Sequence, residues 1–345
     1  MRAIGFAFVT LSMLLTAPVW AAAPAYRIID RIKVGDGRFD YAVFDDSTNR
    51  VYMSRSFTTT VIDVKTNKVS QLDSAANGHM TLPIPGTSLA VVPRAQGMEL
   101  PIPRDAPGMI RIVDLKTDSV VADLPAGINP DGAVYDPFSK LVFVMNHVSG
   151  ESTVVDPVKH AVVATIPVGG TLEFPASDGT GKVFVNVQDQ NRIGIIDVKT
   201  MKVVGYYPLA GCQSPTGLAY IPGENLLVSA CGNGVAKVIS ADTGKEIASS
   251  AIGRGPDAVK YDPVRHVVLI PSGRDGELDI IAVADPSKIN VVQRLPTQVG
   301  CRTGVVDPAT GRFYTMASRP GPAPAGGGGR AAPLPGSFEV LVIGP

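Results

Sequence analysis

The stretch that decides the fold is Val61-Ile-Asp-Val-Lys-Thr-Asn-Lys-Val69, because it recurs along the chain with small changes. It returns as Ile112-Val-Asp-Leu-Lys-Thr-Asp-Ser-Val120 and as Ile195-Ile-Asp-Val-Lys-Thr-Met-Lys-Val203, with looser copies at residues 154–162 and 238–246. Each copy is a β-branched run, a polar turn and a second β-branched run, which is the signature of a β-hairpin. The recurrence predicts a repeat architecture.

A second repeated unit precedes these hairpins. Pro130-Asp-Gly-Ala-Val-Tyr-Asp-Pro137 comes before the apolar run Leu141-Val-Phe-Val144, and Pro256-Asp-Ala-Val-Lys-Tyr-Asp-Pro263 comes before Val267-Val-Leu-Ile270. Each repeat therefore carries two hairpins, or four strands. The 36 glycines and 29 prolines among 345 residues supply the turns that so many short strands need.

One polar position opens the first strand of every repeat and therefore counts the repeats. It occurs seven times, at spacings of 39, 52, 42, 43, 41 and 45 residues, close to the roughly 40–45 residues of a four-stranded propeller blade. The long spacing holds the proline-rich segment 93–107, which we interpret as an inserted loop. We predict an all-β fold, a single seven-bladed β-propeller of four-stranded antiparallel blades. The seven opening residues are Asp40, His79, Asp131, Glu173, Thr216, Asp257 and Arg302.

The two ends of the chain predict how the ring closes. The last repeat contains only three strands, Val305–Val306, Arg312–Met316 and Phe338–Ile343. The segment Tyr26–Lys33 precedes the first repeat and has no other partner, so it should supply the fourth strand and remove an exposed edge. The Gly- and Pro-rich segment 319–335 is a second inserted loop.

Several blade motifs, quoted in order, carry a resemblance: Gly170-Thr-Leu-Glu173, Cys212-Gln-Ser-Pro-Thr-Gly-Leu-Ala219 and Thr297-Gln-Val-Gly-Cys-Arg-Thr303. With Pro130-Asp131 they resemble the YncE-like, YVTN-repeat β-propeller family. The resemblance covers essentially all of the chain after its leader and implies a propeller fold. It implies no particular activity, because propellers host many unrelated functions.

The first residues predict export. A short positive start, Met1-Arg2, is followed by an uncharged run from Ala3 to Leu15 and by small residues at Ala21–Ala23, so residues 1–23 form a signal peptide. The alternative is an uncleaved membrane anchor. The mature domain, residues 24–345, should be periplasmic or secreted and monomeric, without a membrane span. Because Lys+Arg and Asp+Glu both number 31, we expect no nucleic-acid partner.

The blade symmetry should bring the seven opening residues together around one mouth of the central channel, which makes them the candidate ligand-binding residues. Oxygen ligands and one imidazole suit a divalent cation, and the metal-ligating candidates are Asp40, His79, Asp131, Glu173 and Asp257. The structural alternative is that these residues bond the loops of adjacent blades, with Arg302 as an internal counter-ion. His147 ends a predicted second strand and could also approach the mouth. By contrast, the recurring hairpin acids Asp63, Asp114, Asp156 and Asp197 should hold turn amides.

The function that follows is an exported, non-enzymatic propeller that binds an unknown small ligand or protein. The alternative is a metal-assisted hydrolase of the lactonase or esterase type, with a channel cation polarising a carbonyl and a ring carboxylate or His79 as base. The sequence holds no His-Glu-x-x-His, haem-attachment, Walker or Gly-x-Ser-x-Gly motif.

Three cysteines predict one disulfide and one free thiol. Cys212 precedes the first strand of the fifth repeat and Cys231 ends its second strand, so an antiparallel hairpin returns them to the same end. Cys301 would remain a free, buried thiol.

Overall fold

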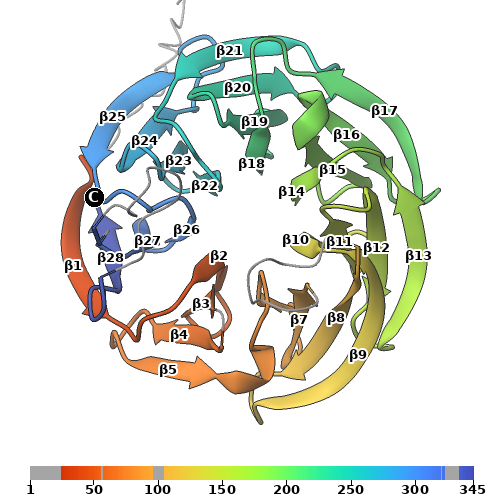
Figure 1. Ribbon diagram of the computed structural model, residues 1–345. Coiled ribbons are helices and arrows are strands. Elements are labelled where there is room, and N and C mark those ends of the chain that lie inside the picture. Colours follow the sequence, from red (N-terminus) through yellow and green to blue (C-terminus); the bar gives the residue numbers. More distant parts are fainter. Residues whose placement is uncertain (1–24, 56, 96–104, 320, 323–333) are drawn as a thin grey trace, which may run out of the picture.

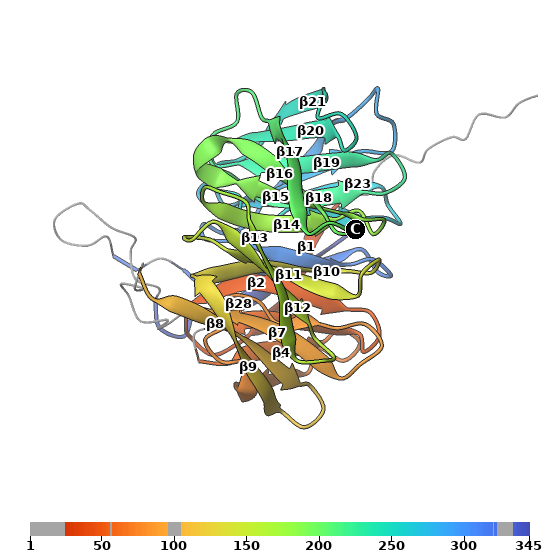
Figure 2. The same ribbon diagram turned by 90° about the vertical axis from the view of Figure 1, so that its right-hand side faces the viewer.

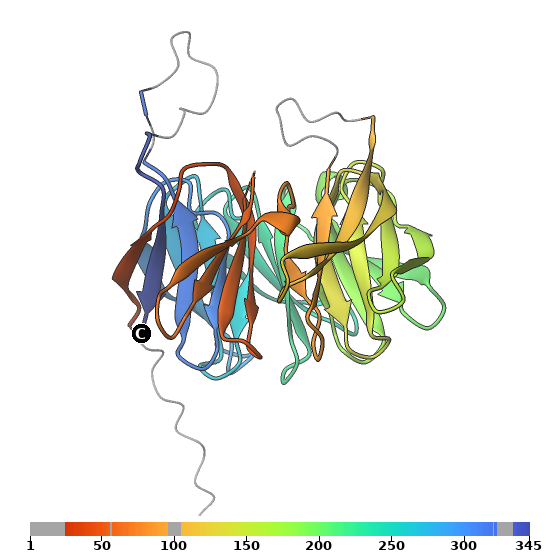
Figure 3. The ribbon, with the colours of Figure 1, turned by 90° about the horizontal axis from the view of Figure 1, so that it is seen from below.

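Seven four-stranded antiparallel sheets form a closed ring of blades in the computed structural model (Figure 1). The structure describes residues 25–55, 57–95, 105–319, 321–322 and 334–345. The ring is a flat disc when seen edge-on (Figures 2 and 3). The predicted fold class is therefore confirmed, including the number of blades and of strands in each blade. None of the described helices is long and apolar enough to span a membrane.

The strands of each blade are given below in order from the ring centre outward. Blade 1 consists of β2 (Phe39–Asp45), β3 (Arg50–Arg55), β4 (Thr59–Asp63) and β5 (Val69–Leu72). Blade 2 consists of β6 (Leu82–Pro83), β7 (Leu89–Arg94), β8 (Pro107–Asp114) and β9 (Ser119–Ile128). Blade 3 consists of β10 (Pro130–Asp136), β11 (Leu141–Asn146), β12 (Glu151–Asp156) and β13 (Ala161–Pro167). Blades 4 and 5 consist of β14 (Leu172–Ser177), β15 (Lys182–Val187), β16 (Arg192–Asp197) and β17 (Lys202–Pro208); and β18 (Pro215–Ile221), β19 (Leu226–Cys231), β20 (Val235–Ser240) and β21 (Glu246–Ala251).

Blades 6 and 7 complete the ring. They consist of β22 (Lys260–Asp262), β23 (Val267–Ser272), β24 (Glu277–Ala282) and β25 (Asn290–Pro296); and β26 (Gly304–Asp307), β27 (Arg312–Ala317), β28 (Glu339–Gly344) and β1 (Arg27–Lys33). Two short 3-10 helices, η1 (Asp73–Ala75) and η2 (Gln188–Gln190), lie in loops.

The N-terminal strand closes the ring as predicted. β1 pairs antiparallel with β28 from Arg27–Gly344 to Lys33–Glu339 (Figure 1). Tyr26 also ties this strand to blade 6, because its N–H donates to Gln293 Oε1 at 2.8 Å and its carbonyl accepts from Gln293 Nε2 at 2.7 Å. No blade of the described ring is left with three strands.

The apolar core lies between the blades rather than at the centre. Seven clusters of buried side chains each join neighbouring blades, such as Val228 of blade 5 with Ile270 of blade 6. The outermost strands alternate instead, and β17 exposes every second residue. This burial accounts for the β-branched runs in the middle two strands and the polar alternation in the fourth.

The recurring hairpin acid is structural, as predicted. Asp63 Oδ1 accepts the backbone N–H groups of Lys65 and Thr66, at 3.1 and 2.9 Å. Asp114, Asp156 and Asp197 accept turn amides in the same way. These side chains fix the turn that the repeated motif encodes.

The inserted segments are partly as predicted. The strands of blade 2 extend into both ends of segment 93–107, since Pro93 pairs with Ile110 and Arg94 with Met109, so its insertion is shorter than expected. The predicted signal peptide, residues 1–23, lies outside the described residues, as does most of segment 319–335.

Candidate functional site

A β-bulge recurs where the innermost strand of a blade begins, and it positions the candidate residues. In blade 3 Asp131 and Gly132 together oppose the single residue Met145. The same irregularity follows Phe39, Leu172 and Pro215 in blades 1, 4 and 5. Bulges are a common way to re-aim a side chain. Here the bulge holds the opening residue and the residue after it.

Three opening residues lie just ahead of their strand, which corrects the expectation that all seven belong to it. His79 precedes β6, Asp257 precedes β22 and Arg302 precedes β26. In blade 6 an isolated β-bridge between Pro256 and Ser272 lies ahead of β22, where the innermost strands of other blades begin. We call the end of the ring that carries the seven opening residues the mouth.

His79 lies between two carboxylates of neighbouring blades. Its Nδ1 is 2.7 Å from Asp40 Oδ2 and 3.2 Å from Asp131 Oδ1. Burial disfavours the charged imidazole, but the charge of Asp131 and the hydrogen bond to Asp40 outweigh it and raise the pKa of His79 to about 9. His79 is therefore a cation at neutral pH. Its other ring nitrogen, Nε2, is buried and has no hydrogen-bond partner among the described residues.

A second group shares Asp131 with the first. His147 Nδ1 lies 3.4 Å from Glu173 Oε1, and ligand atoms of Asp131, His147 and Glu173 all lie within 4.8 Å of one another. Gln188 of η2 donates to Glu173 Oε1 at 2.7 Å. His147, which the sequence left as a possible neighbour, is thus part of the mouth. Asp40, His79 and Asp131 form the other group within the same limit.

Two of the predicted residues serve the ring itself. The Thr216 hydroxyl donates to the carbonyl of Pro256 at 2.7 Å and so joins blades 5 and 6. Arg302 pairs with Asp257, Nε to Oδ2 at 2.9 Å, and donates to the carbonyl of Phe39 at 2.9 Å. The structural alternative thus describes Thr216 and Arg302 well, and neither they nor Asp257 belong to the two histidine-containing groups.

The mouth carries more negative than positive charge. Four carboxylates face two cations, Arg302 and His79, so full ionisation would leave two unbalanced negative charges. The buried Glu173 relieves part of this excess, because burial and the charges of Asp131, Asp257 and Asp40 raise its pKa well above the ordinary value. Burial likewise raises the pKa of Asp131 to about 6, although His79 opposes the shift. The mouth therefore holds protons where a bound cation could take their place.

Two aromatic rings meet beneath these carboxylates. Tyr41 of blade 1 and Phe174 of blade 4 have ring centroids 5.1 Å apart in an edge-on arrangement. Blades 1 and 4 are not neighbours, so this contact crosses the ring centre (Figure 1). Burial and the four carboxylates raise the pKa of Tyr41 well above its ordinary value, so its hydroxyl stays protonated. Both residues follow an opening residue directly in the sequence, a signal that a search restricted to polar positions overlooked.

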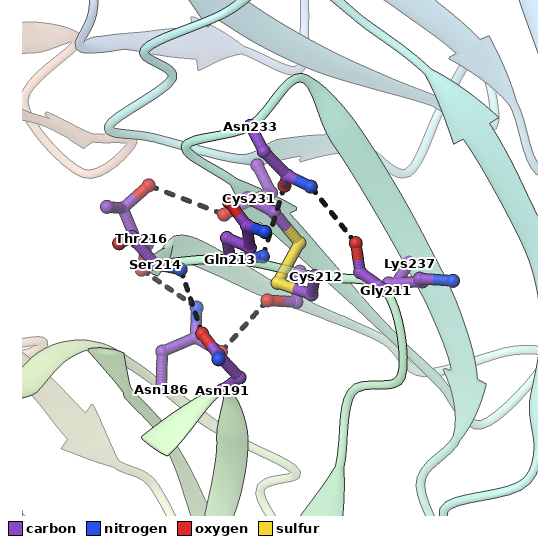
Figure 4. The surroundings of a disulfide bond; sticks show 12 residues. Asn186, Asn191, Gly211, Cys212, Gln213, Ser214, Thr216, Cys231, Asn233 and Lys237 are labelled. Atoms are coloured by element: carbon purple, nitrogen blue, oxygen red, sulfur yellow. Dashed lines mark hydrogen bonds between the residues drawn. A yellow bond between two sulfur atoms is a disulfide. The ribbon is translucent and has the colours of Figure 1, made fainter. Parts of the chain in front are cut away.

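The predicted disulfide lies in the loop that leads to Thr216 (Figure 4). Cys212 and Cys231 are bonded, with Cα atoms 5.4 Å apart. Asn233 braces this loop: its Oδ1 accepts from the Gln213 N–H at 3.1 Å, and its Nδ2 donates to the Gly211 carbonyl at 3.0 Å. Cys301 is a free, buried thiol as expected, and burial raises its pKa to about 11. Thiolate chemistry at Cys301 is therefore disfavoured.

Both inserted segments start and end at the mouth face. His79 N–H donates to the carbonyl of Pro93, near the end of β7, at 3.0 Å. Phe338, just before β28, packs edge-on against Phe39, the residue before Asp40, with ring centroids 5.5 Å apart. The attachment strands of both segments reach the same rim of the disc (Figure 3). The face that carries the mouth is thus also the face at which both inserted segments are attached.

Comparisons with known proteins support the fold. No protein-family model matches the chain, and no curated protein matches its sequence. A chain in the crystal structure of a mitotic checkpoint complex aligns with a TM-score of 0.69 at 13% identity, over 100% of this chain and 99% of that chain. A chain of Kuenenia stuttgartiensis hydrazine synthase aligns with a TM-score of 0.69 at 15% identity, over 82% of this chain and 94% of that one. Identities this low show a shared propeller fold and nothing of function.

Proposed function

We propose that this protein is an exported, non-enzymatic binding propeller whose mouth takes a cationic ligand, in the simplest case a divalent metal ion. Asp131 is the central ligand, because it belongs to both carboxylate–histidine groups. The sharing of Asp131 between Asp40–His79 and His147–Glu173 is the observation that carries the proposal. Carboxylate oxygens with imidazole nitrogens are a donor set that Mn²⁺ or Zn²⁺ accepts, and Ca²⁺ would use the oxygens alone.

The protonation of the mouth supports the same proposal. The carboxylates of the mouth raise the pKa of His79 to about 9, so His79 holds a proton at neutral pH, and burial with the neighbouring carboxylates raises the pKa of Glu173 well above its ordinary value. A metal ligand must give up its proton, so binding of an ion should release protons into solution. The affinity should therefore rise with pH. A site built only to join blades would show no such coupling.

Calorimetric titration of the mature protein with Mn²⁺, Zn²⁺, Ca²⁺ and Mg²⁺ tests the proposal. We expect at least one ion to bind with release of protons at pH 7, measured by comparing buffers of different ionisation enthalpy. An ion present at about 100 times its Kd should stabilise the fold by roughly 2.7 kcal/mol. Asp131→Asn should abolish this gain. Asp63→Asn, which changes an acid at a hairpin turn, is the matched control and should leave the gain intact.

Absence of an Asp131-dependent response to all four ions would contradict a metal site. Titration with methylammonium then tests whether the mouth binds an organic cation instead of a metal ion, because an ammonium group needs the carboxylates but no imidazole ligand. Binding of neither would leave the mouth a structural junction between blades, as the contacts of Thr216 and Arg302 already are.

The alternative of a metal-assisted lactonase or esterase rests on the same ion. Without an ion, the pKa of about 9 keeps His79 protonated at neutral pH, and as a ligand of the ion its ring nitrogen would be engaged, so a ring carboxylate would have to act as base. A panel of lactones and esters, assayed with and without a chelator, separates the two proposals. Chelator-sensitive turnover that Asp131→Asn abolishes would establish the hydrolase.

The proposed compartment and family have support of different kinds. A disulfide between Cys212 and Cys231 suits an oxidising environment outside the cytoplasm, as does the leader sequence of residues 1–23. Membership in the YncE-like group rests on the blade motifs alone. The ligand could be free in solution or be part of a partner protein bound at the mouth face.

A further inference from the structure

Lys260 is the one charged residue among the seven that lie three positions after the opening residues of the blades. It lies three residues after the opening residue of blade 6 and pairs with Leu269, as Val43 of blade 1 pairs with Tyr52. The corresponding position in the other blades is aliphatic throughout: Val43, Leu82, Val134, Ala176, Ala219 and Val305. Blade symmetry therefore gives no structural reason for a lysine here.

The Lys260 side chain reaches across the ring centre. Its Nζ lies 4.3 Å from the centroid of the Phe174 ring. Phe174 belongs to blade 4 and Lys260 to blade 6, with blade 5 between them (Figure 1). Tyr41 of blade 1 packs edge-on against the same Phe174 ring. Lys260, Phe174 and Tyr41 thus come from three separate blades and meet beneath the mouth.

Among the described residues no carboxylate pairs with the Lys260 ammonium group, and the interaction that the group makes there is a cation–π contact with the face of Phe174. Lys237 provides a contrast, because its side chain is buried and its Nζ lies 3.0 Å from Glu246 Oε2. Lys260 is partly buried. Burial lowers the pKa of Lys260 to about 8.

We propose that Lys260 is a nucleophilic amine that forms a Schiff base with a small, neutral aldehyde bound beside Phe174. The Nζ lone pair attacks the carbonyl carbon, a C–N bond forms and the carbonyl oxygen becomes a hydroxyl. One amine hydrogen moves to the oxygen to complete that hydroxyl, and loss of the hydroxyl with the remaining amine hydrogen as one water molecule leaves the C=N bond. The step needs no oxidant or reductant, and it is independent of a cation at the mouth.

A neutral carbonyl compound suits the surroundings better than an anion does. The carboxylates of the mouth carry net negative charge and oppose the entry of anions. Aromatic and aliphatic side chains around the amine favour an apolar ligand. With a pKa of about 8, roughly one tenth of the amine is neutral at pH 7, against about one in 3,000 for an ordinary lysine. Desolvation of this kind is a known way to activate a lysine nucleophile.

Reductive trapping with propionaldehyde and sodium cyanoborohydride at pH 7 tests the proposal on the mature protein. The hydride reduces any imine to a stable propylamine, which peptide mass mapping locates. We expect Lys260 to be labelled at least about tenfold faster than Lys159 and Lys288, whose side chains are 80% exposed. Lys260→Met should remove the fast label, and Lys237→Met should leave it unchanged.

Lys260→Arg keeps the charge and cannot form an imine, so it replaces Lys260→Met if that variant fails to fold. Labelling of Lys260 no faster than that of Lys159 and Lys288 would overturn the proposal. Propionate provides the anionic counterpart of the probe. If propionate raised the melting temperature of the wild type but not of Lys260→Met, while the aldehyde failed to label, the site would be an anion site and the Schiff base would be refuted.

Discussion

The imidazole of His79 should titrate far above the range of ordinary histidines, and Asp131 should be the main reason. Burial lowers the pKa of His79, yet the charge of Asp131 at 3.2 Å and the bond to Asp40 at 2.7 Å raise it to about 9. Removal of the Asp131 charge leaves burial and Asp40 in opposition. An opposite charge at this distance shifts a pKa by about 1–3 units, so Asp131→Asn should lower the pKa of His79 by at least about one unit.

The same shift has a consequence for stability. A pKa raised from 6.5 to about 9 means that the folded protein keeps a proton that the unfolded chain has lost between these values. The stabilisation from His79 is therefore complete below about pH 6.5 and disappears as the pH rises through about 9. Its size is on the order of 3 kcal/mol in the wild type. In Asp131→Asn the pH range over which it disappears should move downward.

Nuclear magnetic resonance titration of the imidazole signals in chelator-treated protein measures the shift directly. The chain has four histidines, and the signal lost in His79→Gln assigns the one of interest. Asp63→Asn is the control, since it changes a carboxylate at an exposed hairpin turn. A His79 titration midpoint that is near 6.5 in the wild type, or that Asp131→Asn leaves unmoved, would refute the account of the mouth as a proton-holding carboxylate cluster.

Further predictions concern the disulfide, the closure of the ring and the N-terminal leader. Non-reducing peptide mapping should recover Cys212 linked to Cys231, and replacement of both by serine should cost roughly 3 kcal/mol in urea unfolding, with no loss if the bond does not form. Deletion of Tyr26–Lys33 should expose the edge of β28 and lower the melting temperature sharply. Deletion of residues 323–333 should change it little, and equal losses would contradict the ring closure. Mass spectrometry of exported protein should find a mature N-terminus between Ala22 and Pro24, and retention of Met1 would disprove the signal peptide.

The fold was predictable because its causes are periodic. Every hairpin acid, from Asp63 to Asp197, holds the same turn, and every buried middle strand needs the same β-branched run. Because the same four-strand pattern recurs in seven repeats, few other folds are compatible with the sequence. The last repeat lacked a fourth strand, and this predicted the pairing of Tyr26–Lys33. The length of the first insertion was overestimated because prolines were taken to exclude a strand, whereas Pro93 pairs within β7 and β8.

The site was less predictable because its chemistry lies where the repeats differ. The opening residues could be found from their spacing, but the bulge that holds them also brings the following residue to the centre, and so Tyr41 and Phe174 went unnoticed. The residues grouped with Asp131 include Asp40, His79 and Glu173 of other blades, so the sequence of one repeat does not specify the group. Lys260 breaks an aliphatic pattern that lies three residues after the opening residues, a position that the sequence analysis of the opening residues did not consider. A residue that departs from the symmetry of a repeat protein serves no copy-wide structural need, so these departures are where function should be sought first.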